Sequence, residues 1–530
     1  MKPRFGRFLV PLATAAALAV ALGMIVPGQL CAQEALPKGV HHHYKLIDLG
    51  TFGGPLSFVN TEPTENFINA QGTIVGGADT LVPTPAPSCY NPVNNNDCYI
   101  SHAFAWHNGN LQDLGTLPGG YLSYAEGINN RGQIVGVSEN GQIDPAFGNP
   151  QFHAVLWENG SALDLGTLGG MSSFATTINN QGQIMGVSLN NIPDPYSIVG
   201  LGSLTTLTQT RGFSWQKGHM EDLGDLGGPD TFPIFMNQNG QIAGMSDTGV
   251  LPNPNTGLIP MSPFIWENGK MKDLGNFGGT NPFGLFSGLV SGLNEQGKVT
   301  GTLTSSGDQT VRGFFWNGEK LSDLGTLGGS FTVSYGLNET GEVVGLSSLP
   351  GDNVFHAFLW RNGTMIDLGT VDNDACSTSQ SANSKGQIVG SSQASDGMGG
   401  CVNPFTHAFL WENGGPSVDL NALIPPNSPL RLTVASLISD RGEIVGGGDP
   451  IGCDNNDACN HVYVLIPCDE NHPDIEGCDY SLVAAASTSQ TGAALETAPR
   501  TPQFPPPQAE AAPLKRILSE RKGYGIRLPI

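Results

Sequence analysis

A single phrase recurs along most of this chain, and its period limits the folds that the chain can adopt. The phrase is clearest at residues 355–390, where FHAFLW is followed by an Asn-Gly pair, then by DLG, and then by KGQIVG. Its Asp-Leu-Gly element starts at Asp48 and returns at spacings of 65, 51, 58, 51, 50, 44 and 52 residues, the last copy being Asp419-Leu420-Asn421. A period of about fifty residues is typical of the four-stranded blades of a β-propeller.

Each copy reads as four short strands, which we name a to d. Strand a holds the aromatic segment, strand b ends in Asp-Leu-Gly, strand c runs up to an asparagine, and strand d holds the QIVG segment. An Asn-x-x-Gly segment between c and d fits a type I turn that ends in a left-handed glycine. An Asn-Gly pair between a and b suits a type I′ turn, because both central residues need a positive φ. These pairs are Asn108-Gly109, Asn159-Gly160, Asn268-Gly269, Asn317-Gly318, Asn362-Gly363 and Asn413-Gly414.

The two ends of the repeat region are complementary. The region enters at a strand b, residues 44–50, and leaves at a strand a, residues 461–466, so the last strand is needed to complete the first unit. We therefore predict an all-β propeller of four-stranded antiparallel blades, eight in number, closed by pairing of its first and last strands. Whether the d–a or the b–c connection passes between blades is left open by the sequence.

The repeated aromatic and polar positions are interpreted as structural. All seven tryptophans occupy the same place in the phrase, which a close-packed core position requires. The repeated aspartates could form a carboxylate ring for metal binding or acid–base chemistry, but an Asp at a strand end more often accepts backbone N–H bonds that fix the next loop. The histidines of strand a are expected to donate to a neighbouring strand. The tryptophans are Trp106, Trp157, Trp215, Trp266, Trp316, Trp360 and Trp411.

Both termini depart from the repeat. Three basic residues precede the apolar run 8–26, and Ala32 is a small residue at the expected cut, which is the pattern of a secretory signal peptide. An uncleaved anchor is the alternative; after cleavage no stable membrane span is expected. The predicted organisation is a signal peptide at 1–32, a short linker at 33–43, the propeller at 44–467, an acidic Cys loop at 468–480 and a disordered Pro/Ala-rich tail at 481–530.

The cysteines fit an exported protein. Cleavage after residue 32 leaves eight, and their clustering suggests four local disulfides rather than a metal site, because no pair has C-x-x-C spacing. The expected localisation is secreted: extracellular, periplasmic or at the cell surface. The proposed pairs are Cys89 with Cys98, Cys376 with Cys401, Cys453 with Cys459, and Cys468 with Cys478.

Charge and motif content exclude several functions. The net charge of −23 argues against nucleic-acid binding. No nucleophile elbow, phosphate loop or dinucleotide fingerprint is found, so no catalytic or cofactor-binding residue is assigned. No cofactor is predicted, although Ca²⁺ is a weak alternative at three acidic loops. Histidines 41–43 could bind a metal, but we expect them to be solvated. The acidic loops are 372–374, 454–457 and 469–470.

Two functional hypotheses follow from the predicted architecture. Long insertions at 77–101, 187–210 and 246–261 all follow strand d, so they gather on one face of the ring. We expect a binding or scaffolding module that presents this variable loop face to a protein or glycan partner. The alternative is a propeller hydrolase or lyase that acts on extracellular polysaccharide. Whether any catalysis occurs stays open, with binding favoured.

The joint motif resembles the HAF-repeat family of predicted extracellular bacterial proteins. The resemblance rests on His-Ala-Phe at His102, His356 and His407, together with the Asn-Gly, DLG and QIVG elements in fixed order. It covers about four-fifths of the chain. The family implies export and a repeated β body, and it implies no established activity or catalytic residues. The histidine position holds Arg211, Ser262 and Arg312 in three copies, so this residue is not an obligatory ligand of every unit.

Overall fold

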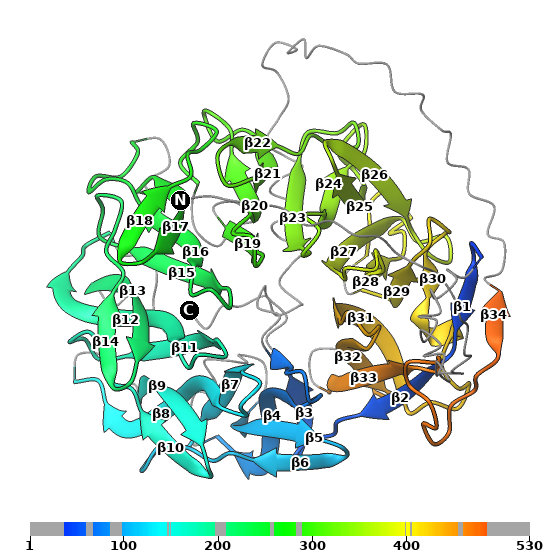
Figure 1. The fold of residues 1–530 in the computed structure, drawn as a ribbon, viewed down its shortest axis with the longest axis horizontal. Helices are drawn as coiled ribbons and strands as arrows, with labels where there is room; N and C mark the ends of the chain where they lie inside the picture. Colours follow the sequence, from blue (N-terminus) through cyan, green and yellow to red (C-terminus); the bar gives the residue numbers. More distant parts are fainter. Residues whose placement is uncertain are drawn as a thin grey trace, which may run out of the picture. The chain divides into compact units, whose positions relative to one another are not determined.

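The computed structural model describes residues 37–59, 67–84, 98–145, 148, 150–196, 208–254, 259–281, 289–397, 399–402, 405–453 and 459–484, all of which belong to one compact unit. These residues form eight four-stranded antiparallel sheets that follow one another around a ring (Figure 1). The prediction of an eight-bladed all-β propeller is confirmed. A further two-stranded sheet pairs β1 (Val40–His42) with β34 (Leu482–Ala484).

We number the blades from the first complete sheet. Blade 1 comprises β3 (Gly53–Phe58), β4 (Ile74–Pro83), β5 (Tyr99–His107) and β6 (Asn110–Asp113), and blade 2 comprises β7 (Ser123–Ile128), β8 (Ile134–Ile143), β9 (Pro150–Glu158) and β10 (Ser161–Asp164). Blade 3 comprises β11 (Ser173–Ile178), β12 (Ile184–Pro193), β13 (Thr208–Gln216) and β14 (His219–Asp222), and blade 4 comprises β15 (Thr231–Met236), β16 (Ile242–Asp247), β17 (Met261–Glu267) and β18 (Lys270–Asp273). Blade 5 comprises β19 (Leu289–Leu293), β20 (Val299–Thr304), β21 (Val311–Trp316) and β22 (Leu321–Asp323), and blade 6 comprises β23 (Thr332–Leu337), β24 (Val343–Ser348), β25 (Phe355–Arg361) and β26 (Thr364–Gly369). Blade 7 comprises β27 (Cys376–Ala382), β28 (Ile388–Gln393), β29 (His407–Trp411) and β30 (Val418–Asp419), and the short 3-10 helix η2 (Leu420–Ala422) follows β30. Blade 8 comprises β31 (Leu430–Ile438), β32 (Ile444–Pro450), β33 (His461–Pro467) and β2 (Tyr44–Asp48).

Strand order settles how the blades are connected. Each blade runs c, d, a, b, with strand c nearest the ring centre and strand b at the rim, as β7, β8, β9 and β10 show in Figure 1. The chain therefore leaves one blade at its outer strand b and crosses to the inner strand c of the next. The b–c connection, which carries the DLG motif and its following glycines, is the link between blades.

The ring is closed by its two ends, as predicted. β2 pairs with β33 in antiparallel register from Tyr44 opposite Pro467 to Asp48 opposite Tyr463. The backbone N–H of Leu49 donates to the carbonyl of Val462 at 3.0 Å and extends the pairing by one residue. A single strand from the start of the chain thus completes blade 8.

The hairpin turns follow their sequence signatures with one exception. Five of the six Asn-Gly pairs have positive φ at both residues, for example 52° at Asn159 and 74° at Gly160. Asn317 does not have a positive φ, because its hairpin is longer. Its side-chain Oδ1 accepts from the N–H of Lys320 at 2.9 Å, and its own N–H donates to the carbonyl of Lys320 at 3.3 Å. Lys217 takes the same left-handed conformation without an Asn, at 52°, beside Gly218.

Strand d carries one glycine per blade whose absent side chain is a packing requirement. In blade 3 a Cβ on Gly186 would lie 1.9 Å from the carbonyl oxygen of Phe174 and 2.8 Å from the ring of Phe213. Strand c bulges next to this position, since the register skips a residue between Ala175 and Thr177. A glycine inside a strand often marks a β-bulge in the sheet or a place where the neighbouring backbone comes very close. The aromatic ring of strand a covers the glycine, which links the HAF and QIVG motifs physically.

The tryptophans pack between blades. Six of the seven are buried, and Trp411 is half-buried against the core of blade 7. Trp360 of blade 6 lies 5.1 Å from the ring of Phe315 in blade 5, measured between centroids. Across the closure, Trp106 of blade 1 belongs to one core with Val464 of blade 8. The tryptophan of each copy therefore seals a blade junction, as a core assignment requires.

The segments outside the ring are more ordered than expected at two places. Residues 40–42 of the expected linker and 482–484 of the expected tail pair as β1 and β34. This pairing buries His41, whose Nδ1 lies 2.8 Å from Oε1 of Glu412. The expectation that the histidines at 41–43 are solvated is thus wrong for His41. The predicted signal peptide at 1–32 and the part of the predicted tail after residue 484 lie outside the described residues.

No helix in the described ranges has the length and apolar character needed to cross a membrane.

Candidate functional site

The turns between strands c and d form a hydrogen-bonded belt around one end of the central channel. In each turn the asparagine Oδ1 accepts from two N–H groups of its own turn, as Asn129 does from Arg131 at 3.0 Å and from Gln133 at 3.1 Å. Its Nδ2 reaches the next blade and donates to the carbonyl of the equivalent residue, Asn179, at 3.0 Å. Six of the seven asparagines make this bond to the next blade, whereas Asn179 donates to Gln181 and Gln183 of its own turn. The asparagine belt comprises Asn69, Asn129, Asn179, Asn237, Asn294, Asn338, Asn383 and, in blade 8, Ser439.

The belt is open between blade 8 and blade 1. Ser439 has too short a side chain to reach the next turn, and its hydroxyl donates to Glu443 within its own turn. Among the described residues no hydrogen bond joins Ser439 to Asn69, whereas Asn69 does reach the carbonyl of Asn129 in blade 2. The junction of blades 3 and 4 also lacks the asparagine link, but there Gln181 Nε2 donates to the carbonyl of Gln238 at 2.9 Å. At the junction of blades 8 and 1, no hydrogen bond between described residues joins the two c–d turns.

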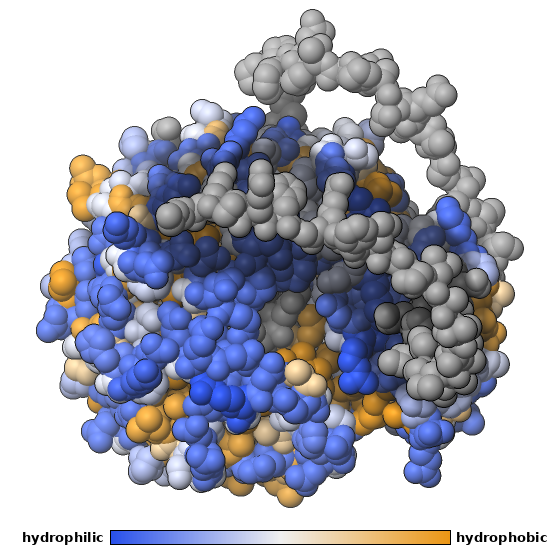
Figure 2. Space-filling view, viewed as in Figure 1, coloured by the Kyte–Doolittle hydropathy of each residue, from blue (hydrophilic) through white to orange (hydrophobic). Residues whose placement is uncertain are grey.

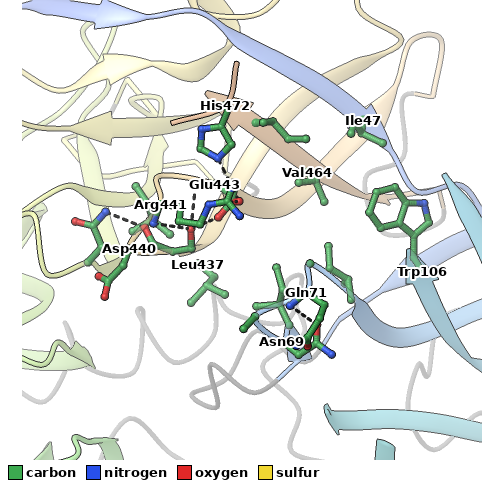
Figure 3. A pocket seen from close by; sticks show the side chains of 18 of the residues that line it. Ile47, Asn69, Gln71, Trp106, Leu437, Asp440, Arg441, Glu443, Val464 and His472 are labelled. Carbon is green, nitrogen blue, oxygen red and sulfur yellow. Dashed lines mark hydrogen bonds and ion pairs between the residues drawn. The ribbon is translucent and has the colours of Figure 1, made fainter. Parts of the chain in front are cut away.

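A cavity of about 580 Å³ lies at this opening and extends across the channel mouth toward the turns of blades 6 and 7 (Figure 3). We call it the mouth cleft. Figure 2 shows a largely hydrophilic face with hydrophobic residues near the central hollow, beside β3 and β4. The cleft has an aliphatic wall and a polar rim. The wall comprises Ile47, Ile68, Leu437, Val464 and Ile466, and the rim includes Asn69, Asp440, Arg441, Glu443 and His472.

One sequence departure adds Ile466 to the apolar wall. The residue after the strand a tryptophan is polar in blades 1 to 7, and it faces the fifth residue of the c–d turn, as Glu158 accepts from Gln133 Nε2 at 2.8 Å. In blade 8 this position holds Ile466, so Glu443 loses its usual partner. The polar residues at this position are His107, Glu158, Gln216, Glu267, Asn317, Arg361 and Glu412.

The loop after the propeller supplies a new partner for Glu443. His472 is 4 % exposed; its Nδ1 lies 2.7 Å from Asp469 Oδ1, and its Nε2 lies 3.3 Å from Glu443 Oε1. Carboxylates therefore contact both ring nitrogens of His472. Arg441 lies 3.4 Å from Glu443, and its side chain is 60 % exposed. The rim therefore offers charged and polar groups that can orient a ligand.

The repeated aspartates have the structural role that the sequence favoured. Asp113 Oδ2 lies 2.8 Å from His102 Nδ1, and its Oδ1 accepts from Gly115 N–H at 2.7 Å. Partial burial opposes ionisation, but these hydrogen bonds outweigh it and lower the pKa of Asp113. Arg211 replaces the histidine in blade 3 and binds Asp222 Oδ2 through Nε at 3.0 Å. The same His–Asp pairing is made by His153 with Asp164, His356 with Asp367, and His461 with Asp48.

Three of the four predicted cysteine pairs lie at disulfide-bonding distance. The Cα atoms are 6.0 Å apart for Cys376 and Cys401, 6.5 Å for Cys453 and Cys459, and 5.5 Å for Cys468 and Cys478. Cys89 lies outside the described residues, so the pair it was assigned with Cys98 is not described. The acidic loop at 454–457 is also outside them.

Sequence reasoning missed a pair of buried acids in blade 4. Asp247 Oδ2 accepts from the N–H of Asp230 at 3.1 Å, and Asp230 Oδ1 accepts from the N–H of Thr210 at 2.7 Å. Burial raises the pKa of Asp230 to about 7, and burial together with the charge of Asp230 raises the pKa of Asp247 to about 8. The Asp247 position, three residues after the strand d glycine, is acidic in other copies as well, at Asp79, Glu139 and Asp449. The burial that shifts the pKa values in blade 4 depends on packing, which the repeat pattern does not reveal.

Replacing Asp247 with asparagine is expected to reduce the loss of stability at alkaline pH. An acid whose pKa rises on folding stabilises the protein near pH 4, and this contribution is lost as the pH rises to about 8. Asparagine keeps an acceptor for the Asp230 N–H and carries no charge. We expect Asp247→Asn to gain about 1–3 kcal/mol over the parent at pH 9 and to differ little at pH 4 in urea denaturation. The same difference at both pH values, or an equal gain in the surface variant Asp474→Asn, would contradict this assignment.

Strand pairing defines the chain as a closed eight-bladed β-propeller. No protein-family model matches the sequence, and no curated protein matches it. Similar solved structures include the β-propeller domain of the Trilobed protease from Pyrococcus furiosus, with 9 % identity over 71 % of this chain and 100 % of that chain and a TM-score of 0.38. Dipeptidyl peptidase 4 from Porphyromonas gingivalis matches with 9 % identity over 79 % and 65 % of the two chains and a TM-score of 0.38. The α-L-arabinofuranosidase Arb93A from Fusarium graminearum matches with 10 % identity over 64 % and 91 % and a TM-score of 0.29. Likeness at this level carries no argument about activity.

Proposed function

We propose that this chain is an exported binding module whose mouth cleft holds an apolar side chain of a peptide or protein partner. The observation that carries the proposal is the coincidence of the cavity with the junction of blades 8 and 1, where no hydrogen bond between described residues joins the two c–d turns. Its volume of about 580 Å³ falls within the range of about 300–1,000 Å³ typical of ligand pockets.

The chemistry of the lining favours a peptide over a glycan. The wall is aliphatic, which suits an apolar anchor residue surrounded by polar contacts at the rim, the usual anatomy of a protein interface. Trp106, the aromatic residue of the lining, is 7 % exposed and presents little ring surface to a sugar. Asn69 and Arg441 at the rim can bind the backbone or polar groups beside the anchor.

Export and the loop face belong to the same proposal. The three cysteine pairs at disulfide distance accord with an oxidising compartment. Strand d ends and strand a begins at the end of the blades opposite the asparagine belt. Residues 85–97, 197–207 and 255–258 of the long d–a insertions lie outside the described residues. That face stays a second predicted contact surface.

A peptide-display experiment tests the proposal. Random peptides selected on the folded wild-type protein are expected to share an apolar anchor, and their Kd should weaken at least about tenfold in Ile466→Asp, because a charge in the wall disfavours an apolar group. Ile366→Asp is the matched control, since Ile366 is exposed on β26. Peptides that bind both variants equally would contradict the cleft as the site. Glycan-array or polysaccharide-degradation signals that Ile466→Asp abolishes, without peptide binding, would replace the peptide proposal.

A further inference from the structure

Blade 7 departs from the histidine–aspartate pairing of blades 1, 2, 6 and 8. Its strand a histidine, His407, would be expected to bind Asp419 at the end of β30. Instead its Nδ1 lies 2.9 Å from Oδ2 of Asp374, which belongs to the b–c connection that enters the blade. Asp419 is left without the cationic or imidazole partner that its counterpart Asp367 has in blade 6.

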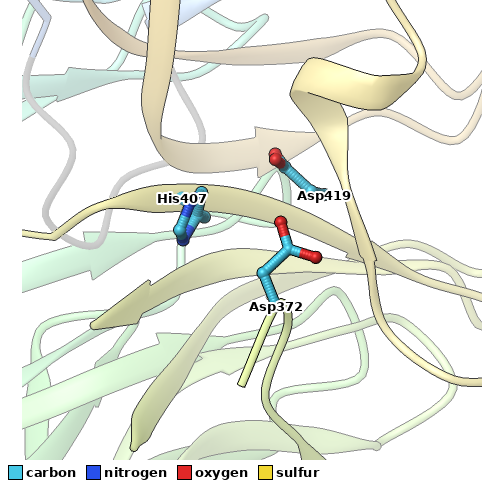
Figure 4. Close-up of side chains that lie close together, drawn as sticks. All are labelled: Asp372, His407 and Asp419. Carbon is cyan, nitrogen blue, oxygen red and sulfur yellow. The ribbon is translucent and has the colours of Figure 1, made fainter. Parts of the chain in front are cut away.

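The diverted side chains leave three ligand groups close together. One ligand atom each from Asp372, His407 and Asp419 lie within 4.8 Å of one another (Figure 4). They come from three segments: the b–c connection, β29 and β30. Within the described residues Asp372 makes no hydrogen bond or ion pair. Asp419 Oδ1 accepts from the N–H of Asn421 at 2.9 Å, and its Oδ2 has no partner of this kind.

We propose that Asp372, His407 and Asp419 bind one divalent first-row transition metal ion, of the class of Zn²⁺ or Mn²⁺. His407 supplies Nε2, because Nδ1 is engaged by Asp374; a carboxylate that orients a metal-binding histidine in this way is a common outer-shell contact. One carboxylate oxygen comes from Asp372 and one from Asp419. Water completes the coordination.

The donor set decides which ion the site takes. The sequence raised Ca²⁺ at residues 372–374 because of their carboxylates, but an imidazole ligand favours Zn²⁺ and its neighbours over Ca²⁺. Three carboxylates around one imidazole leave an excess of negative charge that a dication neutralises. Bound there, the ion ties the b–c connection to strands a and b of blade 7.

Metal titration tests the proposal on the whole exported chain after dialysis against EDTA. We expect Mn²⁺ to bind with a stoichiometry of one by calorimetry and to raise the Tm, and Ca²⁺ to bind more weakly. Asp372→Asn and His407→Gln should each weaken Mn²⁺ binding at least about tenfold. His102→Gln is the matched control, because its histidine is paired with Asp113 in the regular way and lies in blade 1.

The outcomes separate this site from other histidines. Binding that is unchanged in His407→Gln, or that falls equally in His102→Gln, would overturn the proposal and point to residues elsewhere, including His42 and His43. Tighter binding of Ca²⁺ than of Mn²⁺ would overturn the ion class. Zn²⁺ in place of Mn²⁺ gives a second titration with the same expected order of variants.

Discussion

Gly390→Ala is expected to destabilise the protein by about 3–5 kcal/mol, a large share of the ~5–15 kcal/mol typical of a folded domain. A Cβ at Gly390 would lie 2.0 Å from the carbonyl oxygen of Thr378, 2.8 Å from Cα of Ser379 and 2.9 Å from the ring of Phe409. Two of these neighbours are backbone atoms of the adjacent strand, so no rotamer change relieves the overlap. Denaturant unfolding of the variant measures the loss.

A second glycine provides the control for this prediction. A Cβ on Gly249, which lies in the d–a connection of blade 4, has no heavy atom within 4 Å. Gly249→Ala should therefore change stability by no more than about 0.5 kcal/mol. Comparable losses for the two variants would show that the close approach of strands c and d at Gly390 is misplaced.

Much of the fold was predictable because each blade needs the same residue types at its turns and close contacts, and these residues repeat in the sequence. Asn159-Gly160 specifies its hairpin through two positive φ values, and Gly186 marks the place where strand c comes too close for any side chain. Such features return once per blade, so a period could be read from one sequence. The count of eight blades and the closing pair of strands followed from that period and from the phase of the two ends.

The connection between blades was not predictable, because both phases of the repeat close the ring. The backbone conformation of two hairpin turns also differs from what the Asn-Gly pattern predicts. Lys217 adopts the left-handed conformation since Gly218 and the strand pairing on either side impose it, while Asn317 escapes it through a longer loop. In both cases the surrounding hairpin overrides the preference of the residue.

The candidate site was harder to predict because it consists of departures from the repeat. Ile466 and Ser439 are visible in the sequence as exceptions, yet their effect depends on lying at the same blade junction as Ile47, more than 390 residues away. The burial of His41 depends on Glu412, which is 371 residues distant in the chain. Contacts of this length carry no local signature.

Closure by β2 and β33 is the basis of the fold and of the mouth cleft, and a cross-strand disulfide tests it. Lys45 and Ile466 are directly opposite in the register, and both are half-buried. Opposed residues of an antiparallel pair have Cα atoms about 4.5–5.5 Å apart, which a disulfide can span. A bond between positions so distant in sequence constrains the unfolded chain strongly, by about 6 kcal/mol in the loop-entropy estimate.

The decisive measurement is peptide mapping by mass spectrometry of the oxidised double variant, Lys45→Cys with Ile466→Cys. We expect one new bond that joins residues 45 and 466, with the three native cysteine pairs retained and with a higher midpoint of unfolding that reduction removes. Free thiols at both positions in a folded protein would show that the first and last strands of the ring are not neighbours, and would contradict the closed propeller.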